Sequence, residues 1–251
     1  HPLGRPIQGT LESVSAMTPE GISRYFRESY QPANLLITAT GNLEHEKLVS
    51  AIRKAFEPLS NGAAPPFSEP PRLNPGILVK EKKELGQVHI CLGVRGFPLA
   101  HEARFQEYVL NTLLGGTMSS RLFQDIREER GLAYNVFSSL NSFMDTGYLM
   151  VYAATSPESA EQVVRLVQEE FRALKEKAPA EREMKMARDH LKGSLMLSLE
   201  SSSSRMSSLA RQEVYFRRPF TLNEILEGID RVQAEEVRVL AEKIFHRSTC
   251  A

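Results

Sequence analysis

An arginine and a tyrosine, Arg127 and Tyr134, are the side chains whose types and spacing are best suited to chemistry. Arg127 follows Phe123 by four residues on a predicted helix, so it borders the apolar stripe instead of facing open water. Gly131 ends that helix, and Tyr134 enters the next predicted strand. A guanidinium placed there can donate several hydrogen bonds to a carbonyl or carboxylate, and a phenol can donate to a developing oxyanion.

A structural role also fits these two side chains, with Arg127 bonded to carboxylates and Tyr134 capping a core. We expect Tyr134 to share a strand face with Val136 and Ser138, because side chains alternate along a strand. The residues alone leave both roles open. The other charged residues of the helix fit ordinary surface positions: Arg121, Asp125, Glu128 and Glu129.

The elements that must position this pair follow an α+β pattern in the C-terminal part of the chain. We predict the order ββααββ followed by helices, with a largely antiparallel sheet. Strands are expected at about 77–84, 88–94, 133–141 and 148–154. Helices are expected at about 103–114, 120–130, 158–177, 179–199, 206–214, 222–231 and 234–245.

A proline-rich segment, residues 60–76, separates this domain from an N-terminal part. Its five prolines cannot support a helix or a central strand, so we place a domain boundary there. In the N-terminal part, Thr18 caps a predicted helix that runs to about Tyr30. A strand at 35–40 and a helix at about 44–59 follow. The predicted domains are therefore 1–59 and 77–251, joined by a linker.

Composition narrows the classes of function. The 251 residues suit one large domain or two small ones, and the formal net charge of zero argues against a nucleic-acid or acidic-membrane binder. Cys91 and Cys250 lie far apart, outside any CxxC pair, so a reducing compartment is the default. No apolar run approaches the roughly 18 residues of a membrane span.

Two segments of the chain, 11–22 and 226–237, resemble each other. Leu11 matches Leu226, an offset of 226 − 11 = 215 residues. Two amphipathic helices could also be alike by chance. A true repeat predicts that the chain holds the end of one unit and nearly all of a second, lacking its last strand, and was cut from a longer protein. The strand at 35–40 would then lack native partners, and the chain could dimerise through the open edge.

The run Leu-Phe-Gln-Asp-Ile-Arg-Glu-Glu-Arg-Gly-Leu-Ala-Tyr at 122–134 resembles the signature of the second, non-metal domain of the insulinase/pitrilysin metallopeptidases, or inverzincins. This family includes the mitochondrial processing peptidases and many bacterial zinc proteases. Other segments match that domain or the end of the metal-binding one, so the resemblance covers essentially the whole chain. It implies a LuxS/processing-peptidase-like fold. The further matching segments are 1–7, 30–34, 113–116, 119–123, 193–195 and 209–213.

Members of this family bind zinc through an inverted motif, H-x-x-E-H, and a distant glutamate. No two histidines of this chain lie four residues apart, so the motif is absent. In the family the motif precedes the segment that matches His1. The resemblance therefore implies zinc in the upstream part of a full-length parent, and no metal ligand in this chain. His45-Glu46 and His101-Glu102 are the nearest partial matches and fit ordinary polar residues at helix starts.

The resemblance further implies that Arg127 and Tyr134 reach the zinc site of the other domain, contact the bound peptide and help to stabilise its tetrahedral intermediate. The peptide would bind in extended form by adding to a sheet edge. The chain is then the C-terminal portion of a zinc-dependent metalloendopeptidase acting on peptides or presequences, and inactive alone. The alternative is a non-catalytic subunit that binds presequences or serves as a structural core protein. Bacterial cytoplasm is the default location, with periplasm and mitochondrial matrix open.

Overall fold

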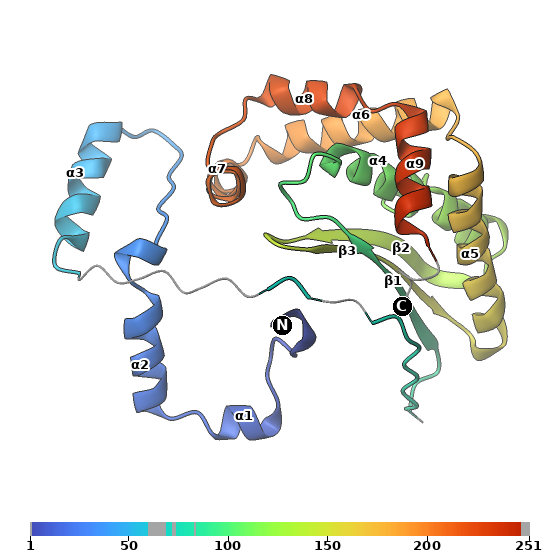
Figure 1. Cartoon of the computed structure of the whole chain (residues 1–251), viewed down its shortest axis with the longest axis horizontal. Helices are drawn as coiled ribbons and strands as arrows, with labels where there is room; N and C mark the ends of the chain where they lie inside the picture. Colours follow the sequence, from blue (N-terminus) through green and yellow to red (C-terminus); the bar gives the residue numbers. More distant parts are fainter. Residues whose placement is uncertain (1, 60–68, 72–73, 83, 247–251) are drawn as a thin grey trace. The chain divides into compact units, whose positions relative to one another are not determined.

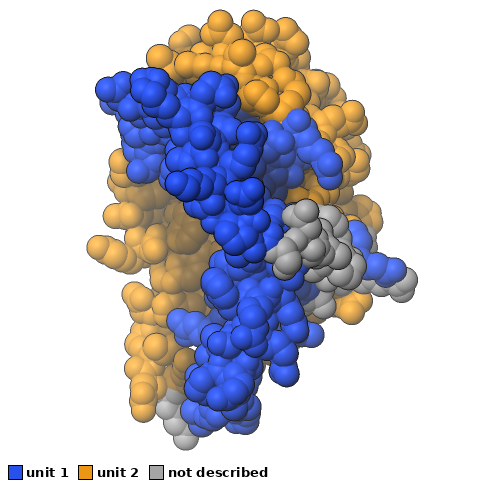
Figure 2. Space-filling view, turned by 90° about the vertical axis from the view of Figure 1, so that its left-hand side faces the viewer, with its two compact units in different colours: residues 1–71, 198–217 blue, residues 72–197, 218–251 orange. Residues whose placement is uncertain are grey.

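The computed structural model describes residues 2–59, 69–71, 74–82 and 84–246. The chain divides into two compact units, coloured separately in Figure 2. Unit 1 comprises residues 1–71 and 198–217, and unit 2 comprises residues 72–197 and 218–251. The sequence assigned 198–217 to the C-terminal domain, whereas their contacts group them with unit 1. Most of the predicted linker, residues 60–68 and 72–73, lies outside the described residues.

Unit 2 contains an antiparallel sheet that has three strands within the described ranges (Figure 1). Strand β1 (Val88–Gly96) pairs with β3 (Gly147–Thr155), which also pairs with β2 (Ala133–Ser142). Ser142 faces Gly147 at the β2–β3 turn. The predicted α+β class with an antiparallel sheet is confirmed, and so are three of its four strands.

Helices α4, α5 and α9 pack on one face of this sheet (Figure 1). Their apolar positions recur every three or four residues, which places them on the side of the helix that meets the strands. On the other face of β1, His89, Cys91 and Arg95 are exposed. The helices of unit 2 are α4 (Arg104–Leu114), a π-helix (Phe123–Glu129), a 3-10 turn (Pro157–Ser159), α5 (Ala160–Glu176), α6 (Glu181–Ser198, all but its last residue), α8 (Leu222–Asp230) and α9 (Ala234–Ile244).

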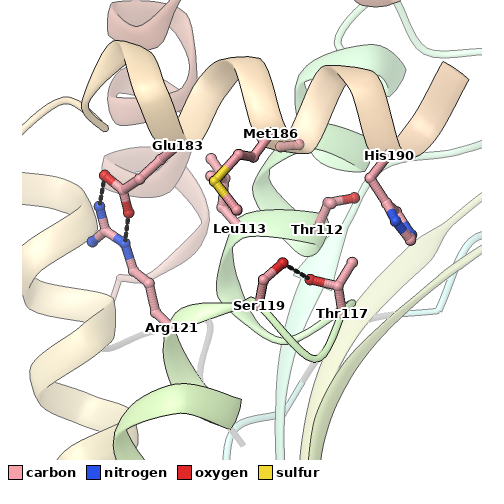
Figure 3. A pocket seen from close by; sticks show the side chains of 9 residues that line it. Thr112, Leu113, Thr117, Ser119, Arg121, Glu183, Met186 and His190 are labelled. Carbon is pink, nitrogen blue, oxygen red and sulfur yellow. Dashed lines mark hydrogen bonds and ion pairs between the residues drawn. The ribbon is translucent and has the colours of Figure 1, made fainter. Parts of the chain in front are cut away.

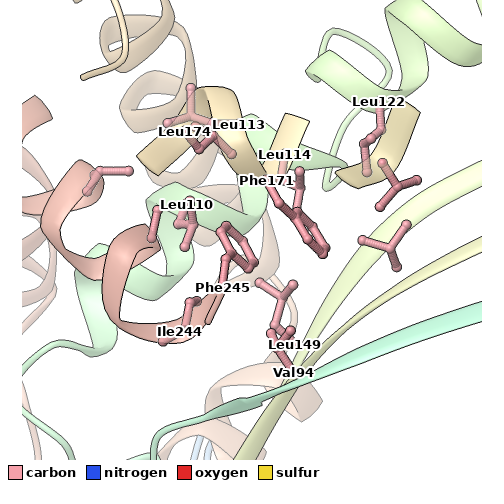
Figure 4. Close-up of a cluster of buried hydrophobic side chains, with 14 of the residues drawn as sticks. Val94, Leu110, Leu113, Leu114, Leu122, Leu149, Phe171, Leu174, Ile244 and Phe245 are labelled. Atoms are coloured by element: carbon pink, nitrogen blue, oxygen red, sulfur yellow. The ribbon is translucent and has the colours of Figure 1, made fainter. Parts of the chain in front are cut away.

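The core of unit 2 lies between these helices and the sheet (Figure 4). Leu110 and Leu114 of α4 are fully buried, as is Leu149 of β3. The rings of Phe171 on α5 and Phe245 after α9 stack with centroids 4.1 Å apart. Each fully buried side chain of this size contributes about 1.5–3 kcal/mol. The same core includes Leu122, which anchors the segment that carries Arg127.

The strands predicted at 35–40 and 77–84 do not form among the described residues. Residues 35–40, 77–82 and 84 have no strand pairing, and residue 83 lies outside the described set. Ile77, Leu78 and Val79 are 95%, 94% and 77% exposed. Apolar and β-branched residues favour a strand only where a neighbouring strand accepts their backbone hydrogen bonds. Here no such neighbour is present in the described part of the chain.

Unit 1 is helical in its described part. Thr18 caps α2 by accepting the Gly21 N–H at 3.1 Å, as the sequence predicted. The Thr40 hydroxyl donates to the Ser202 carbonyl at 2.7 Å and so ties the segment after α2 to α7. Its helices are α1 (Leu11–Ser15), α2 (Pro19–Ser29), α3 (His45–Phe56), α7 (Ser202–Phe216) and the 3-10 turns Pro2–Gly4 and Pro32–Asn34.

One pair of helices, α2 and α9, lies at matching positions of the predicted repeat. Helices α2 and α9 each have 11 residues, and both begin and end 215 positions apart (234 − 19 and 244 − 29). Their environments differ. Val237 and Ala241 of α9 are fully buried, whereas Ile22 and Phe26, the matching residues of α2, are each 57% exposed. The face that α9 buries in unit 2 is therefore largely uncovered on α2 by the described residues.

Helix α4 carries a buried carboxyl group. Glu107 of α4 is 1% exposed, and its Oε1 accepts the Phe97 N–H at 3.0 Å. Its Oε2 is buried and has no hydrogen-bond partner among the described residues. Burial raises the pKa of Glu107 to about 7, against the smaller opposing effect of the Phe97 N–H.

We expect Glu107 to make stability fall as pH rises between about 4.5 and about 7. The Glu107 carboxyl loses its proton near pH 4.5 in the unfolded chain and near pH 7 in the folded chain. The stability that the raised pKa contributes is therefore complete below about pH 4.5, and it is lost as the pH rises through the folded value of about 7. Glu107→Gln keeps a side-chain oxygen that can accept the Phe97 N–H, and it removes the carboxyl group that titrates. Urea unfolding should show wild type losing about 2–3 kcal/mol relative to the variant over this range. A difference that is constant with pH would contradict this assignment.

Candidate functional site

Arg127 lies in a π-helix, Phe123–Glu129, where the sequence predicted an α-helix. Two hydrogen bonds tie the end of this helix to the residues that follow it. The Leu132 N–H donates to the Ile126 carbonyl at 2.9 Å, and the Gly131 N–H donates to the Arg127 carbonyl at 3.1 Å. Gly131 has φ +63°, a left-handed conformation that glycine adopts without steric cost. Single π-helical turns are rare and occur frequently at functional sites.

Tyr134 lies at a β-bulge at the start of β2. The register with β3 shifts between Ala133 and Asn135, so Tyr134 is the extra residue. Tyr134 is 78% exposed, whereas Val136 and Ser138 are 1% and 5% exposed. The prediction that these three share a face is wrong, because one inserted residue reverses the alternation that follows. The bulge thereby turns the phenol away from the core.

The structure brings Arg127 and Tyr134 together. The Arg127 Cζ lies 5.4 Å from the centroid of the Tyr134 ring and 4.7 Å from that of Phe123. Both distances lie within the range of cation–π attraction. The ion pair of Arg127 is a loose one, with 3.7 Å between its Nε and Glu128 Oε1.

Neither the guanidinium of Arg127 nor the hydroxyl of Tyr134 has a hydrogen-bond partner within the described residues. A held cation with unused N–H donors beside an exposed phenol can donate to a carbonyl oxygen or a carboxylate. The arrangement therefore suits recognition of a peptide backbone or of a negative charge that develops on it.

Arg121 is not the ordinary surface charge that the sequence indicated. Its Nε and Nη2 donate to Glu183 of α6 at 2.8 and 3.0 Å, and its Nη1 lies 3.5 Å from Glu170 of α5. Burial raises the pKa of Glu170, although the charge of Arg121 opposes that shift. Glu183 lies 62 residues away from Arg121 in sequence, so no local pattern indicates this contact. It fixes the helical segment just before the π-helix.

This ion pair lines a small cavity between α4, the loop after it and α6 (Figure 3). The cavity measures about 50 Å³, enough for a few water molecules at most. The hydroxyls of Thr117 and Ser119 lie 3.2 Å apart at its wall, and His190 lies at the opposite end from Arg121. We assign this cavity no chemistry beyond the support that its ion pair gives to the site.

The described residues do not fit a catalytic metal. Within residues 2–59, 69–71, 74–82 and 84–246, no three His, Cys, Asp or Glu side chains gather closely enough to hold a metal ion. None of the helices formed by these described residues is long and apolar enough to cross a membrane.

The chain is similar to proteins of a known family. Residues 16–191 match the family model described as the peptidase M16 inactive domain. An "uncharacterized zinc protease" of Mycobacterium leprae is 39% identical over 251 residues, covering 98% of this chain and 56% of the relative. The chain thus spans just over half the length of that relative.

Solved structures show the same fold. The chain superposes on a peptidase M16 inactive domain from Pseudomonas fluorescens with a TM-score of 0.87 and 21% identity, covering 100% of this chain and 60% of that one. A chain of complex III2 from Candida albicans gives a TM-score of 0.88 at 22% identity, covering 99% and 61%. The resemblance drawn from the run at 122–134 is confirmed: the chain belongs to the peptidase M16 family and contains its inactive domain.

Proposed function

We propose that the chain is the substrate-contacting, non-catalytic portion of a zinc-dependent endopeptidase, and that Arg127 and Tyr134 donate hydrogen bonds to the substrate near the bond that is cut. The observation that carries this proposal is the pair itself. A guanidinium with unused donors lies 5.4 Å from the ring of a phenol whose hydroxyl has no partner within the described chain. Donors already oriented toward a developing oxyanion lower its energy in the transition state.

The zinc in this proposal belongs to a part of the protein that precedes this chain. The relative from Mycobacterium leprae is named a zinc protease and extends well beyond the match, which supports a longer parent. In this arrangement residues 1–59 complete the catalytic half. The apolar face of α2 would then pack in that half as the matching face of α9 packs in unit 2.

The substrate class that suits the site is a peptide in extended conformation. Strands β1 and β2 lie at the two edges of the described sheet, where a further strand can add, although the Ser138 N–H of β2 already donates to the Gly115 carbonyl. A peptide that adds to such an edge is held by its main chain, so many sequences can bind. Tyr134 lies at the start of β2, within reach of a peptide at that edge.

We would test this with the full-length protein and an unstructured peptide, measuring hydrolysis and bound zinc together. Zinc-dependent cleavage that chelation abolishes is expected, and the present chain alone should neither bind zinc nor cleave. A full-length protein that binds peptides without cleaving them, with zinc supplied, would contradict the enzyme proposal. It would favour the alternative, a presequence-binding or structural subunit, for which the likeness to a chain of complex III2 is the motivating observation.

A further inference from the structure

Phe123 has no assigned part in the site described above, yet its ring lies against Arg127. It precedes Arg127 by four residues in the π-helix, and the Arg127 Cζ lies 4.7 Å from the centre of its ring. We propose that Phe123 is a positioning residue, which together with Tyr134 holds the guanidinium in place by ring contact. This inference rests on the function proposed above, because it concerns the group that would bind substrate.

The other arginines of this segment are held differently. Arg121 donates two hydrogen bonds to Glu183, at 2.8 and 3.0 Å, and Arg130 donates to Asp125 at 2.8 Å. Among the described residues, the ion pairing of Arg127 is limited to the loose contact of 3.7 Å with Glu128, whose side chain is 52% exposed. Exposed ion pairs of that kind fix a side chain weakly.

Because aromatic rings hold the Arg127 guanidinium, its N–H groups stay available to bind a substrate. A carboxylate that fixes an arginine also occupies its N–H donors and neutralises its charge. An aromatic ring attracts the cation through its π-face and leaves the N–H groups in place. Arg127 therefore keeps its donors and its charge for a substrate while its orientation is restricted. That combination is what a preorganised donor requires.

Phe123 can serve in this way because its own position is fixed. Its neighbours Leu122 and Ile126 are both fully buried, and Phe123 itself is half-buried. The side chain is thus partly packed and partly open toward Arg127. Of the two rings beside the guanidinium, Phe123 is the one that belongs to the same helix, so it moves together with the residue that it positions.

The test compares Phe123→Leu with Phe123→Tyr in the full-length protein. Leucine keeps an apolar side chain without a π-face, and tyrosine keeps the ring. We expect Phe123→Leu to lower kcat about 3- to 10-fold with a smaller change in KM, and Phe123→Tyr to restore kcat. Thermal unfolding of each variant checks that the effect is not a loss of fold. A Phe123→Tyr variant as impaired as Phe123→Leu would overturn the proposal.

The decisive arm repeats Phe123→Leu in an Arg127→Ala background. If Phe123 acts through Arg127, the second substitution should cost nothing further in kcat. If Phe123→Leu lowers kcat by the same factor with and without Arg127, the role of Phe123 is structural and the proposal is wrong. A failure of the proposed function would give a different result, because Arg127→Ala would leave kcat at the wild-type value. In that case Phe123 would have no group to position.

Discussion

Replacing Arg127 by alanine in the full-length protein should lower kcat for peptide hydrolysis about 10²-fold or more, because a donor to the developing oxyanion is lost. The KM should change less, since the interaction strengthens only in the transition state. Tyr134→Phe removes one hydroxyl and keeps the ring that contacts Arg127, so its effect should have the same sign. Steady-state kinetics on one peptide would measure both.

Arg130→Ala is the matched control for this experiment. Arg130 lies three residues beyond Arg127 and forms an ion pair with Asp125 at 2.8 Å. The variant removes one positive charge from the same segment and leaves the contact between Arg127 and Tyr134 intact. Its kcat should stay within about twofold of wild type, because exposed ion pairs contribute little. Equal losses in the two alanine variants would mean that charge, or local folding, governs activity, and would remove Arg127 from its proposed role.

Gly115→Ala should destabilise unit 2 by about 3 kcal/mol. Gly115 follows α4 where that helix meets β2, and its carbonyl accepts the Ser138 N–H at 3.0 Å. A Cβ at Gly115 would overlap the Ser138 backbone nitrogen and lie 2.9 Å from its hydroxyl oxygen. Backbone atoms cannot rotate away as a flexible side chain can. The helix would have to separate from the strand, and denaturant unfolding should show the loss.

Gly193→Ala is the control for that variant. Gly193 lies inside α6, and a Cβ there would have no atom within 4 Å. Alanine favours a helix over glycine by about 1 kcal/mol, so this variant should be slightly more stable than wild type. Opposite signs for the same chemical change would show that space decides the effect. Destabilisation of similar size in both variants would contradict the packing argument.

The sequence predicted regular elements well, because regular elements follow from local periodicity. The helix at 103–114 and the hairpin of 133–141 with 148–154 formed within a few residues of the expected bounds. The segment at 77–84 shows the limit of this reasoning. Its apolar residues satisfy a strand pattern, but pairing depends on a neighbour that local sequence does not specify.

Type and spacing drew attention to Arg127 and Tyr134, and the family resemblance assigned them to the candidate site. The structure places the two side by side, but their geometry was not predicted. Their roles stay proposals. The face of Tyr134 was predicted wrongly, because a bulge leaves no signal in the alternation of a short strand. The tie from Arg121 to Glu183 was missed, since it joins residues 62 positions apart.

The π-helix and the bulge together make the number of residues between Phe123 and Val136 as important as their identity. Each irregularity adds one residue to an otherwise regular element, one in the helix and one in the strand. Deleting one of the two exposed residues between the buried Ala133 and Val136 would restore a regular ladder, and the residue that remains would be exposed and paired with β3. Regular pairing therefore removes the unpaired position that Tyr134 now holds beside Arg127, so a variant shortened by one residue has a more regular strand and lacks the present geometry of the pair.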